Sequence, residues 1–109
     1  MEKSKLSITY KNLSNLEKQL LRSITEAMKE TDSGSIMIPI PGDNNTSQSE
    51  MKASLSCLLH GALIYDDGNT YRYSRPLLGW RINFKDRTIL INVNLDTKDQ
   101  FVQKTEEII

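Results

Sequence analysis

The chain has 109 residues, of which 38% are hydrophobic and 26% charged, and its formal net charge at pH 7 is zero. These values are typical of one soluble globular domain, and they exclude a disordered chain or two separate cores. The apolar runs are too short to span a bilayer, and the N-terminus lacks the apolar segment of a signal peptide. A single cysteine, Cys57, excludes an internal disulfide and fits a reducing compartment. We therefore expect one cytoplasmic domain over residues 1–109, without membrane contact.

The first forty residues predict an arm, a helix and a strand. Residues 1–11 alternate polar and apolar side chains, which indicates a short strand or a loose N-terminal arm. Ser14 and Glu17 have the spacing of a capping box, and apolar residues at helical spacing follow them, so we expect a helix over about 13–30. The alternating isoleucines that come next predict a short strand. Pro39 places that strand at a sheet edge because proline lacks an N–H group.

The middle of the chain predicts a helix followed at once by a β-hairpin. Ser47 and Glu50 form a second capping box, and the apolar stripe behind them ends at Gly61. The Asp67-Gly68 pair that follows is a strong hairpin-turn signal between two short strands. A helix that leads directly into a hairpin is the back half of a winged helix-turn-helix, and the tip of this wing would be acidic.

A second hairpin and a last helix complete the prediction. Alternating apolar residues from Trp80 to Leu95, with a Lys-Asp-Arg turn between them, predict two further strands. Residues 96–109 predict a C-terminal helix capped by Asp96. The expected fold is therefore α+β and winged helix-like, with the order α-β-α-β-β-β-β-α and two β-hairpins.

With these elements placed, the stretch SEMKASLSCLLHGALIYDDGNTYRYSRPLLGWRINFKDRTILINVNLD resembles the first winged-helix domain of iteron-binding plasmid replication initiators. A helix and a strand carry the resemblance, together with a hairpin of the type "basic turn, then I-x-I-x-x-x-L", here Trp80–Lys85 followed by Arg87–Leu95. The resemblance implies a domain that dimerises and supports phosphate contacts, with the Arg81–Leu95 hairpin near the dimer contact. The chain departs from the standard winged helix at residues 41–46, which are typical of a loop where a short helix is usual.

Positive charge is concentrated in residues 68–94, which contain five cationic residues and one acidic residue, Asp86. Together with Lys52 of the second helix they are the candidate nucleic-acid-binding residues: Arg72, Arg75, Arg81, Lys85 and Arg87. Gathered on one accessible face, they would contact the phosphates of double-stranded DNA. Because the second helix offers few base-reading side chains, we expect weak binding with little sequence preference. Alternatively, these cations are only the solvated side of a sheet.

Two further patterns have both a functional and a structural interpretation. Tyr71, Tyr73 and Trp80 interleave with the cations and would stack on unpaired bases, or else they form core and cross-strand contacts. Cys57 and His60 lie three apart on a helix, but no third group orients them as a nucleophile and base. With one histidine in the chain, no histidine-rich metal site is possible. We expect no catalytic residues, no metal and no cofactor, and hence no enzyme.

Two functions remain open. The first is a DNA-binding winged helix that forms a homodimer and acts in plasmid or phage replication or its control. The second is a protein–protein interaction module that does not bind nucleic acid. The dimer is predicted from the apolar end Ile108-Ile109, and from a return strand of the second hairpin that is expected at a sheet edge.

Overall fold

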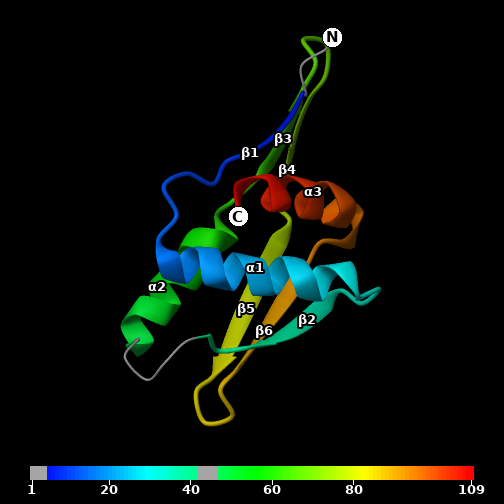
Figure 1. Cartoon of the computed structure of the whole chain (residues 1–109). Coiled ribbons are helices and arrows are strands. Elements are labelled where there is room, and N and C mark those ends of the chain that lie inside the picture. Colours follow the sequence, from blue (N-terminus) through cyan, green and yellow to red (C-terminus); the bar gives the residue numbers. More distant parts are fainter. Residues whose placement is uncertain (1–4, 42–46) are drawn as a thin grey trace.

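The described part of the chain contains three α-helices and two three-stranded antiparallel sheets (Figure 1). The computed structural model describes residues 5–41 and 47–109. The elements in chain order are β1 (Leu6–Ile8), α1 (Asn15–Lys29), β2 (Ser35–Pro39), α2 (Gln48–Leu59), β3 (Leu63–Asp66), β4 (Tyr71–Ser74), β5 (Leu77–Asn83), β6 (Thr88–Val93), the 3-10 helix η1 (Leu95–Thr97) and α3 (Lys98–Ile108). The α+β class and both hairpins are confirmed, and β1 and η1 are additional to the expected order.

The strands pair in the orders β1-β3-β4 and β2-β6-β5. Pro39 lies in β2, an edge strand, as expected. One expectation about the second hairpin was wrong. Its return strand β6 is not at an edge, because β2 and β5 pair with it on either side. The hairpin that directly follows α2 forms the other sheet with β1.

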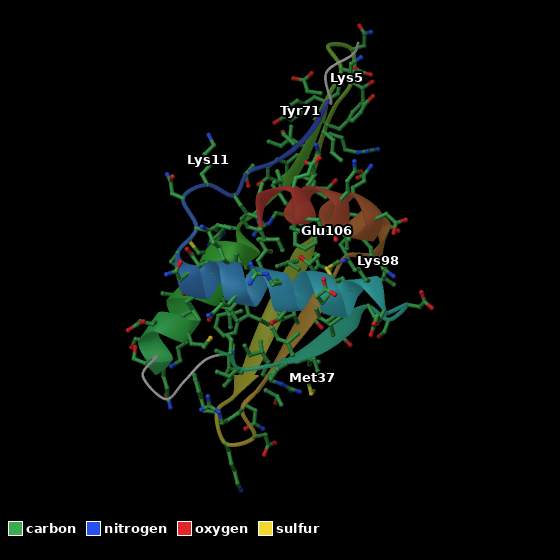
Figure 2. All side chains as sticks on the ribbon, in the orientation of Figure 1. Lys5, Lys11, Met37, Tyr71, Lys98 and Glu106 are labelled. Carbon is green, nitrogen blue, oxygen red and sulfur yellow. The ribbon has the colours of Figure 1, made fainter. Side chains whose placement is uncertain are left out.

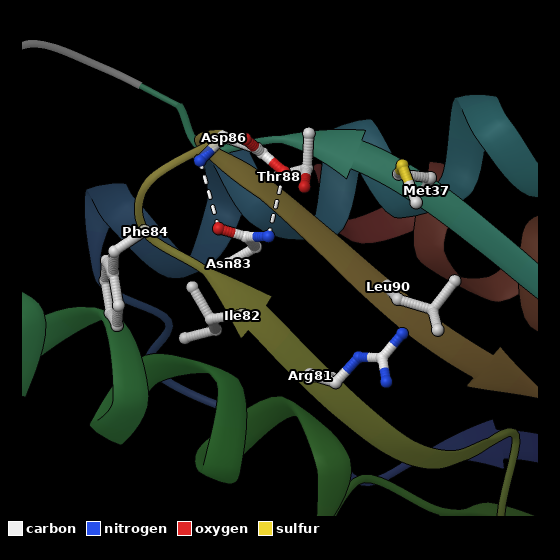
Figure 3. Close-up of a pocket in the computed structure, with 8 residues that line it drawn as sticks. All are labelled: Met37, Arg81, Ile82, Asn83, Phe84, Asp86, Thr88 and Leu90. Carbon is white, nitrogen blue, oxygen red and sulfur yellow. Dashed lines mark hydrogen bonds between the residues drawn. The ribbon is translucent and has the colours of Figure 1, made fainter.

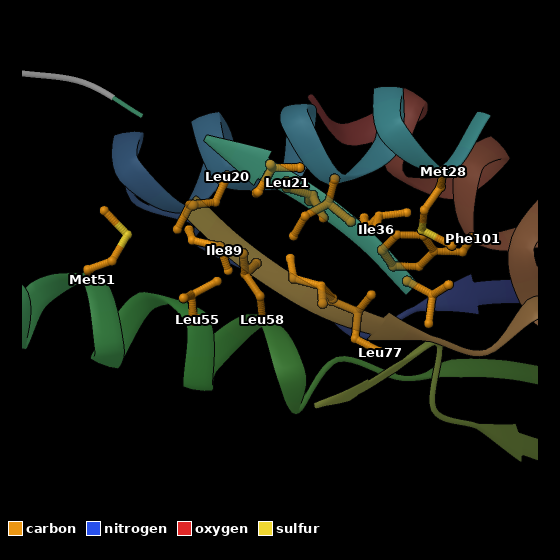
Figure 4. Close-up of a cluster of buried hydrophobic side chains, with 14 of the residues drawn as sticks. Leu20, Leu21, Met28, Ile36, Met51, Leu55, Leu58, Leu77, Ile89 and Phe101 are labelled. Carbon is orange, nitrogen blue, oxygen red and sulfur yellow. The ribbon is translucent and has the colours of Figure 1, made fainter. Parts of the chain in front are cut away.

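The three helices and the inner face of the β2-β6-β5 sheet enclose the core (Figure 4). Nine apolar residues of α1, α2 and the second hairpin are either buried in this core or packed against it: Leu16, Leu20, Ile24, Met51, Leu55, Leu58, Leu59, Trp80 and Phe84. The last two isoleucines differ in burial: Ile109 packs against this core, whereas Ile108 is 39% exposed. In the described ranges, none of the helices has the length and apolar character needed to cross a membrane.

The helix ends follow local capping chemistry. At α1 the expected capping box is confirmed, with the Ser14 N–H donating to Glu17 Oε1 at 2.8 Å and the Glu17 N–H donating to Ser14 Oγ at 3.1 Å. At α2 the Ser47 hydroxyl accepts the N–H of Glu50 at 3.1 Å. The expected Asp96 cap was wrong: the Asn94 side chain caps η1, so that α3 begins only at Lys98.

Tyr10 fastens the β1 segment to both α2 and α3. Its hydroxyl donates to the carbonyl oxygen of Leu58 at 2.6 Å, and its ring meets Phe101 edge to face at 6.4 Å. The ring also lies on Gly61, where a Cβ atom would come within 2.1 Å of Tyr10 Cε1. Gly61 does follow α2 as expected, but its lack of a side chain is needed for the tyrosine ring.

Gly61→Ala should therefore destabilise the fold by about 1–3 kcal/mol, the usual cost of forcing extra atoms into a packed site. The measurement is the free energy of unfolding in urea. Gly34→Ala is the matched control, because a Cβ at Gly34 has no atom within 4 Å. Equal unfolding midpoints for the two variants would show that the Tyr10 ring is free to move away.

Candidate nucleic-acid interface

The structure separates the six predicted cations into two groups at opposite ends of the molecule. The β3–β4 hairpin and the turn between β5 and β6 point in opposite directions along a molecule whose longest extent is 48 Å (Figure 1). Arg72 belongs to β4 of the first hairpin, and Arg75 directly follows this strand at the base of the hairpin. Arg81, Lys85 and Arg87 belong to the second. The cations expected on one face are thus not all brought together.

The turn Phe84–Arg87 between β5 and β6 is held by hydrogen bonds between Asn83 and Asp86 and by a backbone bond to Ile40. Asn83 Nδ2 donates to Asp86 Oδ2 at 2.9 Å, and the Asp86 N–H donates to Asn83 Oδ1 at 3.0 Å (Figure 3). Arg87 has a φ of 56°, in the left-handed region, and its carbonyl oxygen accepts the N–H of Ile40 at 3.0 Å. The exposed cations Lys85 and Arg87 therefore project from an ordered turn.

Lys52 of α2 joins this turn. Its ammonium nitrogen lies 6.0 Å from the centre of the Phe84 ring, within the range of a cation–π contact. We name Lys52, Lys85 and Arg87 the basic turn. All three side chains are exposed and come from two different elements, α2 and the β5–β6 connection.

The outer face of the β2-β6-β5 sheet carries Arg81 beside apolar side chains. Arg81 and Leu90 are cross-strand neighbours, and with Met37 they line an open hollow of about 570 Å³ (Figure 3). Met37 is 61% exposed. Within residues 5–41 and 47–109, Arg81 has neither a hydrogen-bond nor an ion-pair partner, so its charge faces solvent.

At the other end, the β3–β4 hairpin combines engaged cations, exposed tyrosines and an acidic tip. The Arg72 guanidinium lies 5.4 Å from the centre of the Tyr65 ring, and Arg75 donates to the carbonyl oxygen of Leu59 at 3.1 Å. Tyr71 and Tyr73 are 63% and 54% exposed, whereas Trp80 is half-buried against the core. Trp80 therefore packs against the core, whereas the two tyrosines lie outside it and have Asp66 and Ile64 as their cross-strand neighbours.

At the tip of this hairpin, the carboxylates of Asp66 and Asp67 accept hydrogen bonds from the backbone of the turn. Hydrogen bonds from the backbone N–H groups of Thr70 and Asn69, at 2.7 and 2.9 Å, lower the pKa of Asp67, and the Tyr65 hydroxyl adds a further bond. Asp66 accepts the N–H of Gly68 at 3.0 Å. Both carboxylates thus shape the turn, and their charge opposes phosphate at this tip.

Cys57 and His60 do line one hollow, together with Glu17 of α1. A hydrogen bond from the thiol to the Glu17 carboxylate, followed by partial burial, raises the pKa of Cys57. A nucleophilic cysteine requires the opposite shift. Among the described residues there is also no cluster of His, Cys, Asp and Glu suited to a metal ion.

The raised pKa predicts slow alkylation of Cys57 by iodoacetamide near neutral pH, although the thiol is exposed. Glu17→Gln keeps a capping residue at that helix position but removes the carboxylate charge. The thiol pKa should then fall and alkylation should accelerate, by up to about tenfold for one pKa unit. Glu30→Gln, another acid of the α1 region, is the control and should leave the rate unchanged. Equal rates for Glu17→Gln and the native protein would contradict the assigned cause.

The fold and these sites define a small α+β domain with a basic turn at one end and an exposed tyrosine strand at the other. Comparison with protein families, with curated proteins and with solved structures finds no match to this chain. Its function has therefore to be inferred from the geometry of its own residues.

Proposed function

We propose that this chain is a non-enzymatic, DNA-associated winged-helix domain that contacts the phosphates of double-stranded DNA through its basic turn, associates as a dimer, and acts in plasmid or phage replication or its control. The observation that carries the proposal is the position of the basic turn. Its residues Lys85 and Arg87 lie at the tip of the hairpin whose strand β6 pairs with β2, and its third residue, Lys52 of α2, lies over Phe84 of the same tip.

The strand pairing supports the winged-helix interpretation. In winged-helix folds, the strand after the first helix pairs with the returning strand of the hairpin that forms the wing. Here β2 follows α1 and pairs with β6, in the order β2-β6-β5. The wing of this proposal is therefore the β5–β6 hairpin, and the β3–β4 hairpin is an insertion between α2 and the wing.

This reassignment changes the electrostatics of the wing. The wing expected from the sequence ended in Asp66 and Asp67, which would repel phosphate. The β5–β6 turn carries Lys85 and Arg87 with Asp86, and the Asp86 carboxylate is occupied by the Asn83 amide. With Lys52 alongside, the turn has an excess of positive charge, and such an excess attracts the DNA backbone.

The polar side of α2 supports phosphate contact and does not support base recognition. Recognition helices present Arg, Lys, Asn or Gln to base edges near their N-terminal turns. In α2 these turns carry Gln48, Glu50 and Lys52, all exposed. Of these, only Lys52 is a cation, and Glu50 opposes the backbone. The proposal is therefore for weak binding that depends little on sequence.

The test is a fluorescence titration of labelled DNA duplexes at several salt concentrations. Lys85→Gln combined with Arg87→Asn removes both wing charges, and Asn tolerates the left-handed conformation of residue 87. We expect lower affinity for all duplexes alike. The slope of log K against log salt should become shallower by about 1.8, since each neutralised phosphate contributes about 0.9.

The matched control is Lys18→Gln with Arg22→Gln, which removes two exposed charges from α1. This control should retain the salt slope of the native protein. If native protein and control bind duplex no better than the wing variant at low salt, the basic turn does not bind DNA. The alternative function, an interaction module without nucleic acid, would then account for this end of the molecule.

We propose the outer face of the β2-β6-β5 sheet as the dimer contact, because β6 has no free edge that could pair with a second copy. Support comes from Met37 and Leu90, apolar side chains on a face that none of the described helices covers. Met37→Glu should convert a dimer into a monomer in sedimentation, because it would bury a charge in the contact. Leu95→Glu, at an exposed leucine of η1 outside this sheet, is the control. A native protein that sediments as a monomer would refute the dimer.

A further inference from the structure

Tyr71 and Tyr73 of β4 are large apolar side chains that lie exposed at the surface. In the β3–β4 pairing, Tyr71 lies opposite Asp66 and Tyr73 lies opposite Ile64. Leu63 alternates with Ile64 and is 2% exposed, so the core lies on the other face of this sheet. Tyr71 and Tyr73 thus share the face that points away from the core.

The backbone of β4 is open along the same strand. The N–H of Asp66 donates to the carbonyl oxygen of Lys5, just before β1, and the N–H of Asp67 donates to that of Thr70. Because bonded pairs alternate in an antiparallel ladder, the N–H and C=O groups of Tyr71 and Tyr73 point to the outer edge. Among the described strands, β4 has a neighbour on one side only. Both the rings of Tyr71 and Tyr73 and the backbone edge of β4 are therefore accessible to a ligand.

One exposed cation, Lys5, lies near the rings. It lies next to Asp66 across the sheet, at the same end as Tyr71 (Figure 2). The Asp66 carboxylate, which lies between them, accepts the N–H of Gly68 in its own turn. At the base of β4, Arg75 follows Tyr73 by two positions and donates to the carbonyl oxygen of Leu59.

The spacing of the rings suits an extended nucleic-acid strand. Residues two apart in a strand are separated by about 6.6–6.8 Å. This is about twice the ~3.4 Å separation of stacked bases, so each ring can receive a different base of a strand that is drawn out. Aromatic side chains that accept bases beside cations that accept phosphates are the usual means of binding unpaired strands.

We propose that Tyr71 and Tyr73 stack on unpaired bases of single-stranded nucleic acid, with Lys5 on a phosphate. This site goes beyond the proposed function, because its ligand is a single strand and it lies at the opposite end from the basic turn. A chain with both sites would hold a duplex at one end and an opened strand at the other.

The test is a fluorescence-anisotropy titration of a short labelled oligodeoxynucleotide of mixed sequence at low salt. Tyr73→Leu and Tyr71→Leu should each weaken binding by about tenfold or more, whereas Tyr73→Phe should bind as the native protein does, because stacking needs the ring and not the hydroxyl. An abasic strand of equal length keeps the phosphates but has no bases to stack. Its affinity for the native protein should therefore be no higher than the affinity of the intact strand for the leucine variants.

Two further measurements distinguish this site from the basic turn and from an edge that pairs with a protein strand. The Lys85→Gln, Arg87→Asn variant should keep its affinity for the single strand, so that failure of the wing proposal leaves this one intact. The proposal is overturned if the leucine variants bind as the native protein does, if Tyr73→Phe is as weak as Tyr73→Leu, or if no single strand binds. A change of sedimentation in Tyr73→Leu with unchanged oligonucleotide binding would assign the β4 edge to a protein strand and would also overturn it.

Discussion

The structure depends most on the contact between Tyr10 and Gly61. The Tyr10 ring lies over Gly61, which has no side chain, and contacts Phe101 of α3 edge to face. Its hydroxyl group donates a hydrogen bond to the carbonyl oxygen of Leu58 near the end of α2. The strand β1 has three residues, too few to be stable by itself. Backbone and hydroxyl contacts of the neighbouring Thr9 with Ala62 extend the same attachment. The β1-β3-β4 sheet, and with it the tyrosine row, is fixed to the core through this point.

A second set of buried contacts fixes α3, which begins late in the chain, to α1. The hydroxyl groups of Thr25 and Thr105 share a hydrogen bond of 2.8 Å inside the core, where an unpaired hydroxyl would be costly. At the surface, Lys29 lies 2.6 Å from Glu106, although an exposed ion pair of this kind adds little stability. The two helices are therefore joined both inside the core and at its surface.

The features that were predictable from the sequence are those encoded over a few residues. The Ser14 and Ser47 caps, the two hairpins and the core stripes follow from local hydrogen bonding and from side-chain period. Pairing between distant strands has no such local signal. Nothing within residues 35–39 indicates that β2 pairs with β6 and not with the nearer hairpin, so the sequence alone favours the acidic hairpin as the wing. Alternation likewise shows that Tyr71 and Tyr73 share a face, but only the packed structure shows which face is covered.

The strand pairing also determines when each sheet can form as the chain is synthesised. β1 must wait for β3, and β2 must wait for β6, so each early strand pairs with one made more than fifty residues later. Folds dominated by such non-local contacts fold slowly for their size. Until the back half of the chain leaves the ribosome, β1 and the isoleucines of β2 have no strand to pair with. Synthesis of this chain therefore includes a period in which two strands are made but not yet paired.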